Sequence, residues 1–154
     1  LDPGQAQVSV FDRGFIFGDG IYEVMAHING RFFYKDAHLD RLKGCLQKIG
    51  ISFDVDALEQ RIPMLIEASG LTGKDCMLYM QVTRGVAPRQ HSYPQGIAPT
   101  CMMYAWPKAL PEINTTPASV VTQTDYRWAR CDIKMTSLLG NVMANQHAMD
   151  HGCY

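Results

Sequence analysis

Apolar and polar residues alternate with a period of two in several short segments of this chain. The clearest are Ile21–Ile28 and Cys76–Val82, where every second side chain is apolar or aromatic. This period is typical of a strand with two different faces. Between Ile28 and the apolar run at 31–34 lies Asn29-Gly30, the strongest short signal for a hairpin with a type I′ turn. Further strands are expected at 100–106 and 119–124.

Other apolar residues recur at helical spacing. The stripe of a first helix consists of Leu39, Leu42, Leu46 and Ile49. Asp36 is the expected N-cap of this helix, and Gly50 can end it in the left-handed conformation. A second helix is predicted over 56–69, where Pro63 must either kink the helix or delay its start.

Prolines and glycines divide the chain into parts. Residues 85–99 are expected to form a loop, and the proline-rich stretch from 107 to 117 to connect two domains. A third helix, capped by Ser137, should follow and run to about His151. The predicted division is a small amino-terminal domain at 1–108, a linker at 109–116, and the beginning of a larger cofactor-binding domain at 117–154. The predicted fold class is α+β: a two-layer α/β sandwich with a mixed or antiparallel sheet, followed by the start of a second, β-rich domain.

Composition narrows the possible classes of protein. The chain has 154 residues, of which 47% are hydrophobic and 19% charged, enough to form a folded core. A net charge of −1 argues against nucleic acid or an anionic membrane as a partner. The five cysteines have no CxxC spacing, and no apolar run has transmembrane length, so we expect a cytoplasmic protein. The absence of an initial Met and the end at Tyr154 suggest a fragment.

Five residues are candidates for chemistry, although each has a plain structural alternative. A lysine placed among apolar residues, such as Lys134, loses hydration of its charged form, and a neutral amine can form a Schiff base with a carbonyl. Arg89 and His91, two apart in a loop, suit the binding of a carboxylate. Taken singly, Lys134 is more often a surface lysine, Arg41 a solvated helix residue and Tyr22 a packed aromatic.

The motifs in their order carry a family resemblance. The segment Asp12–Val24, with the sequence DRGFIFGDGIYEV, resembles the amino-terminal signature of class IV (fold type IV) aminotransferases. The helix segment HLDRL at 38–42 is similar to the family's phosphate-binding helix. The segments TRG at 83–85, PRQH at 88–91, RCDIK at 130–134 and LLGN at 138–141 follow in the family's order, and the Arg89–His91 pair is most like the D-amino-acid aminotransferases.

This resemblance implies a role for each candidate. Lys134 would carry pyridoxal 5′-phosphate covalently, and Arg41 would bind its phosphate. Tyr22, Arg89 and His91 would bind the substrate carboxylate, the last two reaching across from the neighbouring subunit of a homodimer. The implied reaction is transamination between D-amino acids such as D-alanine and 2-oxo acids such as 2-oxoglutarate. One departure is that the family's glutamate against the pyridine nitrogen has no counterpart in these residues.

Two other hypotheses remain open at this point. The same framework serves branched-chain L-amino-acid aminotransferases, (R)-amine transaminases and aminodeoxychorismate lyases, which differ around the substrate loop. The chain could instead be a non-catalytic dimerisation module, as its early end suggests. No metal is expected in any of these cases.

Overall fold

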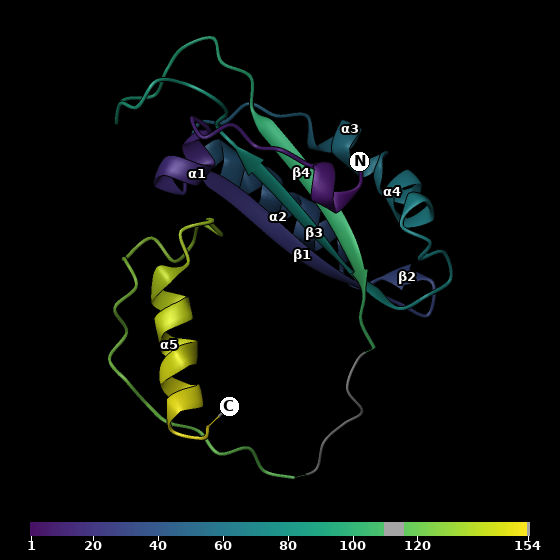
Figure 1. The fold of residues 1–154 in the computed structure, drawn as a ribbon, viewed down its shortest axis with the longest axis vertical. Helices are drawn as coiled ribbons and strands as arrows, with labels where there is room; N and C mark the ends of the chain where they lie inside the picture. The colour runs from purple at the N-terminus through teal and green to yellow at the C-terminus, as the bar shows by residue number, and fades with distance from the viewer. Residues whose placement is uncertain (110–115, 154) are drawn as a thin grey trace.

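The structure is a computed structural model that describes residues 1–109 and 116–153. Its centre is a four-stranded antiparallel sheet in the order β2-β1-β3-β4 (Figure 1). The strands are β1 (Gly20–Ile28), β2 (Arg31–Phe32), β3 (Cys76–Thr83) and β4 (Thr100–Pro107). The sheet is therefore antiparallel throughout, and the α+β prediction for the fold is confirmed.

Three helices cover one face of the sheet: α2 (Lys35–Lys48), α3 (Val55–Glu59) and α4 (Ile62–Ala68). The helix α1 (Arg13–Phe17) and a short 3-10 helix (Pro3–Gln5) precede β1 in the chain. The core lies between α2 and the sheet, where Ile21, Met25, Leu42, Leu78 and Met80 are fully buried. The alternation of buried and half-buried residues along β1 and β3 confirms the predicted period of two.

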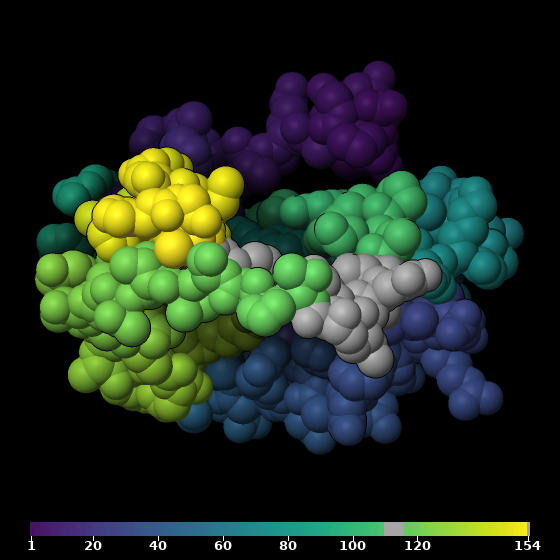
Figure 2. Space-filling view, turned by 90° about the horizontal axis from the view of Figure 1, so that it is seen from below, coloured from purple at the N-terminus to yellow at the C-terminus, as the bar shows by residue number. Residues whose placement is uncertain are grey.

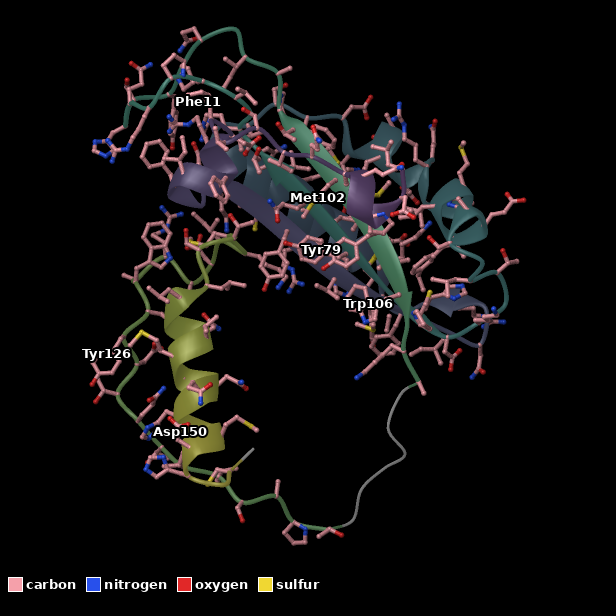
Figure 3. All side chains as sticks on the ribbon, in the orientation of Figure 1. Phe11, Tyr79, Met102, Trp106, Tyr126 and Asp150 are labelled. Carbon is pink, nitrogen blue, oxygen red and sulfur yellow. The ribbon has the colours of Figure 1, made fainter. Side chains whose placement is uncertain are left out.

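The opposite face of the sheet carries a row of aromatic rings. Tyr22, Tyr79, Tyr104 and Trp106 follow one another across β1, β3 and β4, with neighbouring ring centroids 5.1–5.6 Å apart. Figure 3 shows Tyr79, Met102 and Trp106 on this face. None of α2, α3 and α4 covers this face, and Tyr22 at one end of the row lies close to the later segment that carries Lys134.

Several helices and strands begin or end at residues other than the predicted ones. The first helix begins at Lys35 after Tyr34, whose φ of 51° stops the chain from continuing as a strand, so Asp36 lies in the first turn and is not the cap. The predicted helix at 56–69 is two helices, because the chain turns at Arg61 and Pro63 occupies the first turn of the second helix. The predicted return strand at 31–34 ends at Phe32.

The carboxyl-terminal part of the described chain has less regular structure than expected. The prediction of a strand at 119–124 is wrong: these residues are exposed coil. A strand needs a hydrogen-bonded partner, and none of β1–β4 pairs with this segment. The third helix, α5 (Leu139–Asp150), begins after Leu138, because the Ser137 hydroxyl donates a hydrogen bond to the Phe17 carbonyl and does not cap the helix.

The predicted linker at 109–116 falls mostly on residues 110–115, which lie outside the described part of the chain, as does Tyr154. Residues 123–127 and α5 face each other across a shared pocket, and Figure 2 shows the segment after residue 115 and α5 gathered on one side of the molecule. None of the helices in residues 1–109 and 116–153 has the length and apolar character that crossing a membrane requires.

The core makes a simple prediction about stability. Ile66 on α4 is 7% exposed, whereas Met64 on the same helix is 69% exposed. Ile66→Ala should lower the free energy of unfolding by about 2–5 kcal/mol, because it removes buried methyl groups and leaves a cavity. Met64→Ala should change it by less than about 0.5 kcal/mol. Urea unfolding followed by circular dichroism measures both, and equal effects would contradict the described core.

Candidate functional site

A cavity of about 700 Å³ lies beside the start of β1. Its walls come from four separate parts of the chain: residues 17–22, Arg41 and Ile49 on and just after α2, Tyr93 in the loop after β3, and residues 126–141. Among the lining residues are Tyr22, Arg41 and Lys134. Three candidates that are far apart in the sequence therefore meet in one space.

Backbone hydrogen bonds hold the segment of Lys134 against the sheet. The Tyr22 amide donates to the Lys134 carbonyl over 3.2 Å, and the Thr136 amide donates to the Gly20 carbonyl over 3.0 Å. An isolated antiparallel bridge joins Ile21 to Met135. This pairing is available because β2 pairs with β1 only at His27 and Ile28, which leaves the beginning of β1 as an open edge.

The amine of Lys134 lies against the Tyr22 ring at the cavity. Its Nζ lies 3.8 Å from the centroid of the Tyr22 ring, and the residue is half-buried. The neighbouring Ile133 is 6% exposed and belongs to the main core. From α2, the Cys45 sulfur accepts a hydrogen bond from the Lys134 amide over 3.5 Å. The lysine is thus anchored on both sides and is not a freely solvated side chain.

Arg41 reaches the cavity from α2 and is bound to a buried carboxylate. Glu23 is 0% exposed and accepts hydrogen bonds from Arg41 Nε at 2.6 Å and Arg41 Nη2 at 2.8 Å. The His38 Nδ1 lies 2.7 Å from the same carboxylate. The hydrogen bond to Glu23 raises the pKa of Arg41, so the guanidinium keeps its charge. A guanidinium has more donors than Glu23 uses, and the side chain is 50% exposed, which leaves it able to bind an anion.

Arg89 and His91 do not line this cavity. Both are exposed in the loop that follows β3, as the prediction of a loop at 85–99 requires. The Arg89 guanidinium lies 5.4 Å from the Phe17 ring, and the His91 ring lies 5.6 Å from it. The structure therefore brings Tyr22, Arg41 and Lys134 together and leaves the other two candidates beside Phe17.

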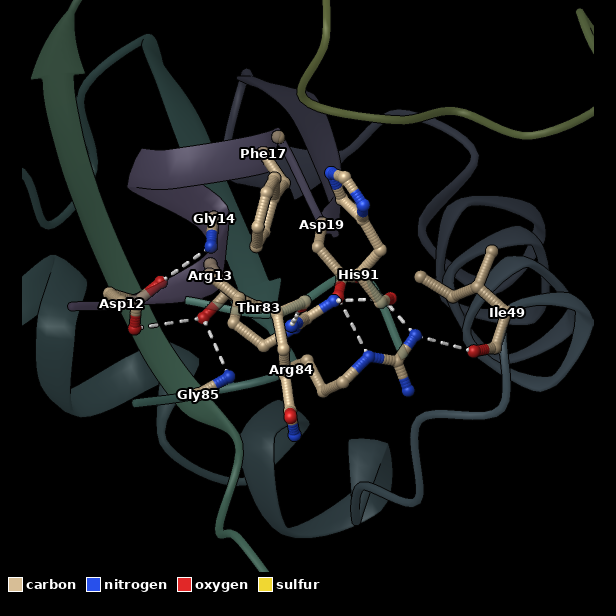
Figure 4. A network of polar contacts seen from close by, with 12 residues as sticks. Asp12, Arg13, Gly14, Phe17, Asp19, Ile49, Thr83, Arg84, Gly85 and His91 are labelled. Atoms are coloured by element: carbon tan, nitrogen blue, oxygen red, sulfur yellow. Dashed lines mark hydrogen bonds and ion pairs between the residues drawn. The ribbon is translucent and has the colours of Figure 1, made fainter. Parts of the chain in front are cut away.

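A buried ionic cluster near the cavity was missed by sequence reasoning. The carboxylate of Asp19 accepts hydrogen bonds from Arg13 at 2.7 Å and from Arg84 at 2.8 and 3.0 Å (Figure 4). The chain turns at Gly18, which ends α1 in the left-handed conformation and leads to Asp19. The available signal was the repeated pairing of charge and glycine in Arg13-Gly14, Asp19-Gly20 and Arg84-Gly85.

The two arginines decide the charge of Asp19. Burial alone would raise the pKa of Asp19, but the hydrogen bonds from Arg84 and Arg13 outweigh burial and lower it below the ordinary value of 3.8. Arg13 is 3% and Arg84 is 5% exposed, so neither guanidinium has water as an alternative partner. The ionised carboxylate is therefore needed to keep both cations in the protein interior.

Comparison with known proteins agrees with this geometry. A family model described as amino-transferase class IV matches residues 20–154. The D-alanine aminotransferase of Bacillus licheniformis is 39% identical over 157 aligned positions, which cover 100% of this chain and 55% of that protein. The branched-chain amino acid aminotransferase of Escherichia coli superposes with a TM-score of 0.81 at 17% identity, over 99% of this chain and 54% of that one. A hypothetical aminotransferase of Mycobacterium tuberculosis in its PLP-bound form gives a TM-score of 0.75 at 20% identity, over 99% and 56%.

The chain belongs to the class IV aminotransferases. Within that class it is related to D-alanine aminotransferases by sequence, while the two structural matches, both at low identity, show the fold alone. The chain spans about half the length of the curated relatives that it matches.

The Asp19 cluster predicts an acid-dependent loss of stability. Asp19→Asn should lower the free energy of unfolding near neutral pH by about 3–5 kcal/mol, because two buried guanidiniums lose their counter-charge. Since the pKa of Asp19 is lowered by folding, the advantage of the wild type is present above pH 3.8 and disappears as the pH falls through the lower, folded-state pKa. Melting temperatures of both proteins between pH 2 and pH 7, about two units below and about three units above that value, measure this difference.

A matched control is Asp125→Asn, which breaks an exposed ion pair with Arg127. This change should leave the melting temperature unaltered, because exposed pairs contribute little. Melting curves for Asp19→Asn that stay parallel to those of the wild type down to the lowest pH would contradict the assignment.

Proposed function

We propose that the complete protein carrying these residues catalyses pyridoxal-phosphate-dependent transamination between D-amino acids, such as D-alanine, and 2-oxo acids, such as 2-oxoglutarate. The observation that carries the proposal is the Lys134 amine, which shares one cavity with the Arg41 guanidinium and lies over the Tyr22 ring. The sequence relationship to D-alanine aminotransferases supports the choice of substrate.

The residues present fit the cofactor in kind and in placement. An amine that can bond to an aldehyde and a guanidinium that can bind a phosphate face the same cavity of about 700 Å³. We therefore propose Lys134 and Arg41 as the residues that hold pyridoxal phosphate. When bound, the cofactor supplies an electron sink for the bond that breaks at the substrate Cα.

The protein side chains would then orient the substrate and move a proton. The Lys134 amine would take a proton from the substrate Cα and return it. The flat ring of Tyr22 limits the positions open to that amine, since it lies 3.8 Å away. Glu23 holds the Arg41 guanidinium in a fixed plane through two hydrogen bonds, so the phosphate site is formed before the ligand arrives.

Tyr22, Arg89 and His91 would bind the substrate carboxylate and so fix the handedness of the reaction. Because Arg89 and His91 do not line the cavity of their own chain, the proposal places them at the site of a second copy in a homodimer. It also includes the division of the chain into a small domain over 1–108, a linker over 109–116, and the first part of the cofactor domain over 117–154.

Lys134→Ala is the direct test of the proposed chemistry. In the complete protein, this change should remove the visible absorbance of the bound cofactor and lower the rate of transamination by about 10²–10⁴-fold, because no other amine in the cavity can replace it. The control is Lys43→Ala, which removes an exposed lysine on α2. Unchanged absorbance and turnover in Lys134→Ala would end the proposal.

Substrate profiling separates the reactions that this class supports. D-alanine should bleach the visible band of the wild-type protein, and 2-oxoglutarate should restore it. A band that responds to L-leucine and not to D-alanine would assign the protein to the branched-chain L-aminotransferases. A complete protein that binds no pyridoxal phosphate would favour the non-catalytic dimerisation module.

The role of Arg41 can be tested by comparing a ligand that carries a phosphate group with the same ligand without it. Arg41→Gln alone would leave the buried Glu23 carboxylate with His38 but without its guanidinium partner, so the informative variant is Glu23→Gln/Arg41→Gln. Compared with Glu23→Gln, it should bind pyridoxal phosphate about 10–100-fold more weakly, the cost of one or two charge-assisted hydrogen bonds, while its affinity for unphosphorylated pyridoxal stays the same. Fluorescence titration gives both constants, and an equal loss for the two ligands would contradict phosphate binding by Arg41.

A further inference from the structure

The backbone of the loop that carries Arg89 and His91 is hydrogen-bonded to a buried arginine. Arg13 on α1 donates a hydrogen bond from Nη1 to the Gln90 carbonyl over 2.6 Å, and its Nη2 lies 3.5 Å from the His91 carbonyl. Its Nε donates to Asp19 over 2.7 Å. Each nitrogen of the guanidinium therefore has a partner, and two of its contacts are backbone carbonyls of an exposed loop far away in the sequence (Figure 4).

Arg84 holds the same loop at a second point. Its guanidinium lies 3.6 Å from the centroid of the Tyr93 ring and donates to the Ile49 carbonyl over 2.7 Å. Asp19 joins Arg84 to Arg13 through its two carboxylate oxygens. The loop is thus fixed on both sides of His91, at the carbonyls of Gln90 and His91 and at the ring of Tyr93.

Phe17 connects this buried cluster to the exposed side chains. Its ring lies 4.8 Å from the Arg13 guanidinium, 5.4 Å from that of Arg89 and 5.6 Å from the ring of His91. The backbone beneath Arg89 and His91 and the ring beside them are both placed by Arg13. Lysine could not replace it, because a single ammonium cannot span a carboxylate and two carbonyl oxygens as a planar guanidinium does.

We propose that Arg13 is a positioning residue for substrate binding: through Asp19, the Gln90 and His91 carbonyls and the Phe17 ring, it sets the place of Arg89 and His91. This inference rests on the proposed function, because it assigns those two side chains to the substrate carboxylate. Arg13 is 3% exposed and does not line the cavity, and the residues that it positions are exposed, so it would control affinity for the carboxylate without touching the substrate. The KM for D-amino acids should therefore depend on Arg13, whereas the reaction at Lys134 should not.

The test is Arg13→Lys in the complete protein, which keeps a positive charge beside Asp19. The KM for D-alanine should rise about 10–100-fold, because a displacement of about 1 Å at a binding group has effects of this size. The kcat should stay within about threefold of the wild type. The dissociation constant of D-alaninol, which has a hydroxymethyl group in place of the carboxylate, should not change. A KM that stays at the wild-type value, or a loss that is equal for the two compounds, would overturn the proposal.

Two further measurements separate positioning from a general loss of stability. Amide hydrogen exchange should become about tenfold faster across residues 85–99 in Arg13→Lys and stay unchanged in the sheet, as expected for local opening of one segment. Ile66→Ala, a core variant far from this loop, should lower stability without changing the KM or the exchange of the loop. Unchanged loop exchange in Arg13→Lys would overturn the inference.

A milder variant covers the case in which Arg13→Lys does not fold. Phe17→Leu leaves the ionic cluster intact and removes only the ring beside Arg89 and His91, so it should raise the KM for D-alanine by a smaller factor, about 3–10-fold. An unchanged KM in Phe17→Leu would also overturn the proposal. If the wild-type protein does not convert D-alanine, the proposed function fails, while the exchange measurement still decides whether Arg13 holds the loop.

Discussion

The site depends on the pairing of residues 134–136 with the open edge of β1. Hydrogen bonds between the Tyr22 amide and the Lys134 carbonyl, and between the Thr136 amide and the Gly20 carbonyl, bring the two segments together. Because neighbouring residues of a strand point to opposite faces, this register puts the Lys134 amine over Tyr22 and sends Ile133 into the core. If this pairing shifted by one residue, the Lys134 side chain would point into the core and the Ile133 side chain toward Tyr22.

Two carboxylates organise the polar groups around this pairing. Glu23, which is fully buried, holds Arg41 and His38 on the α2 side, and Asp19, which is 12% exposed, holds Arg13 and Arg84 on the loop side. Each carboxylate accepts charge-assisted hydrogen bonds from a guanidinium, which fixes the orientation of the arginines. The described residues thus place the Arg41 guanidinium at the cavity and the exposed Arg89–His91 pair outside it.

The hydrophobic pattern was sufficient to predict much of the fold, because it depends on local periods. The alternation in 21–28 and 76–82 and the Leu39–Ile49 stripe correspond to β1, β3 and α2. The prediction of a strand at 119–124 is wrong for a different reason. An alternating pattern indicates which side chains would share a face, but a strand also needs a hydrogen-bonded partner, and the pattern carries no information on pairing. The short helix α1 escaped notice because its five residues span too few turns to show a period.

The candidate residues were found through motif order, and their contacts were not. Arg41 pairs with Glu23, 18 positions away, and Arg84 with Asp19, 65 positions away, and single residues give no sign of such pairs. The central claim is that the Lys134 amine bonds to pyridoxal phosphate. The most direct measurement is borohydride reduction of the complete, cofactor-loaded protein, followed by peptide mass spectrometry. The account predicts a pyridoxyl label on the peptide that contains Lys134; a label on another lysine, or no label at all, would contradict it.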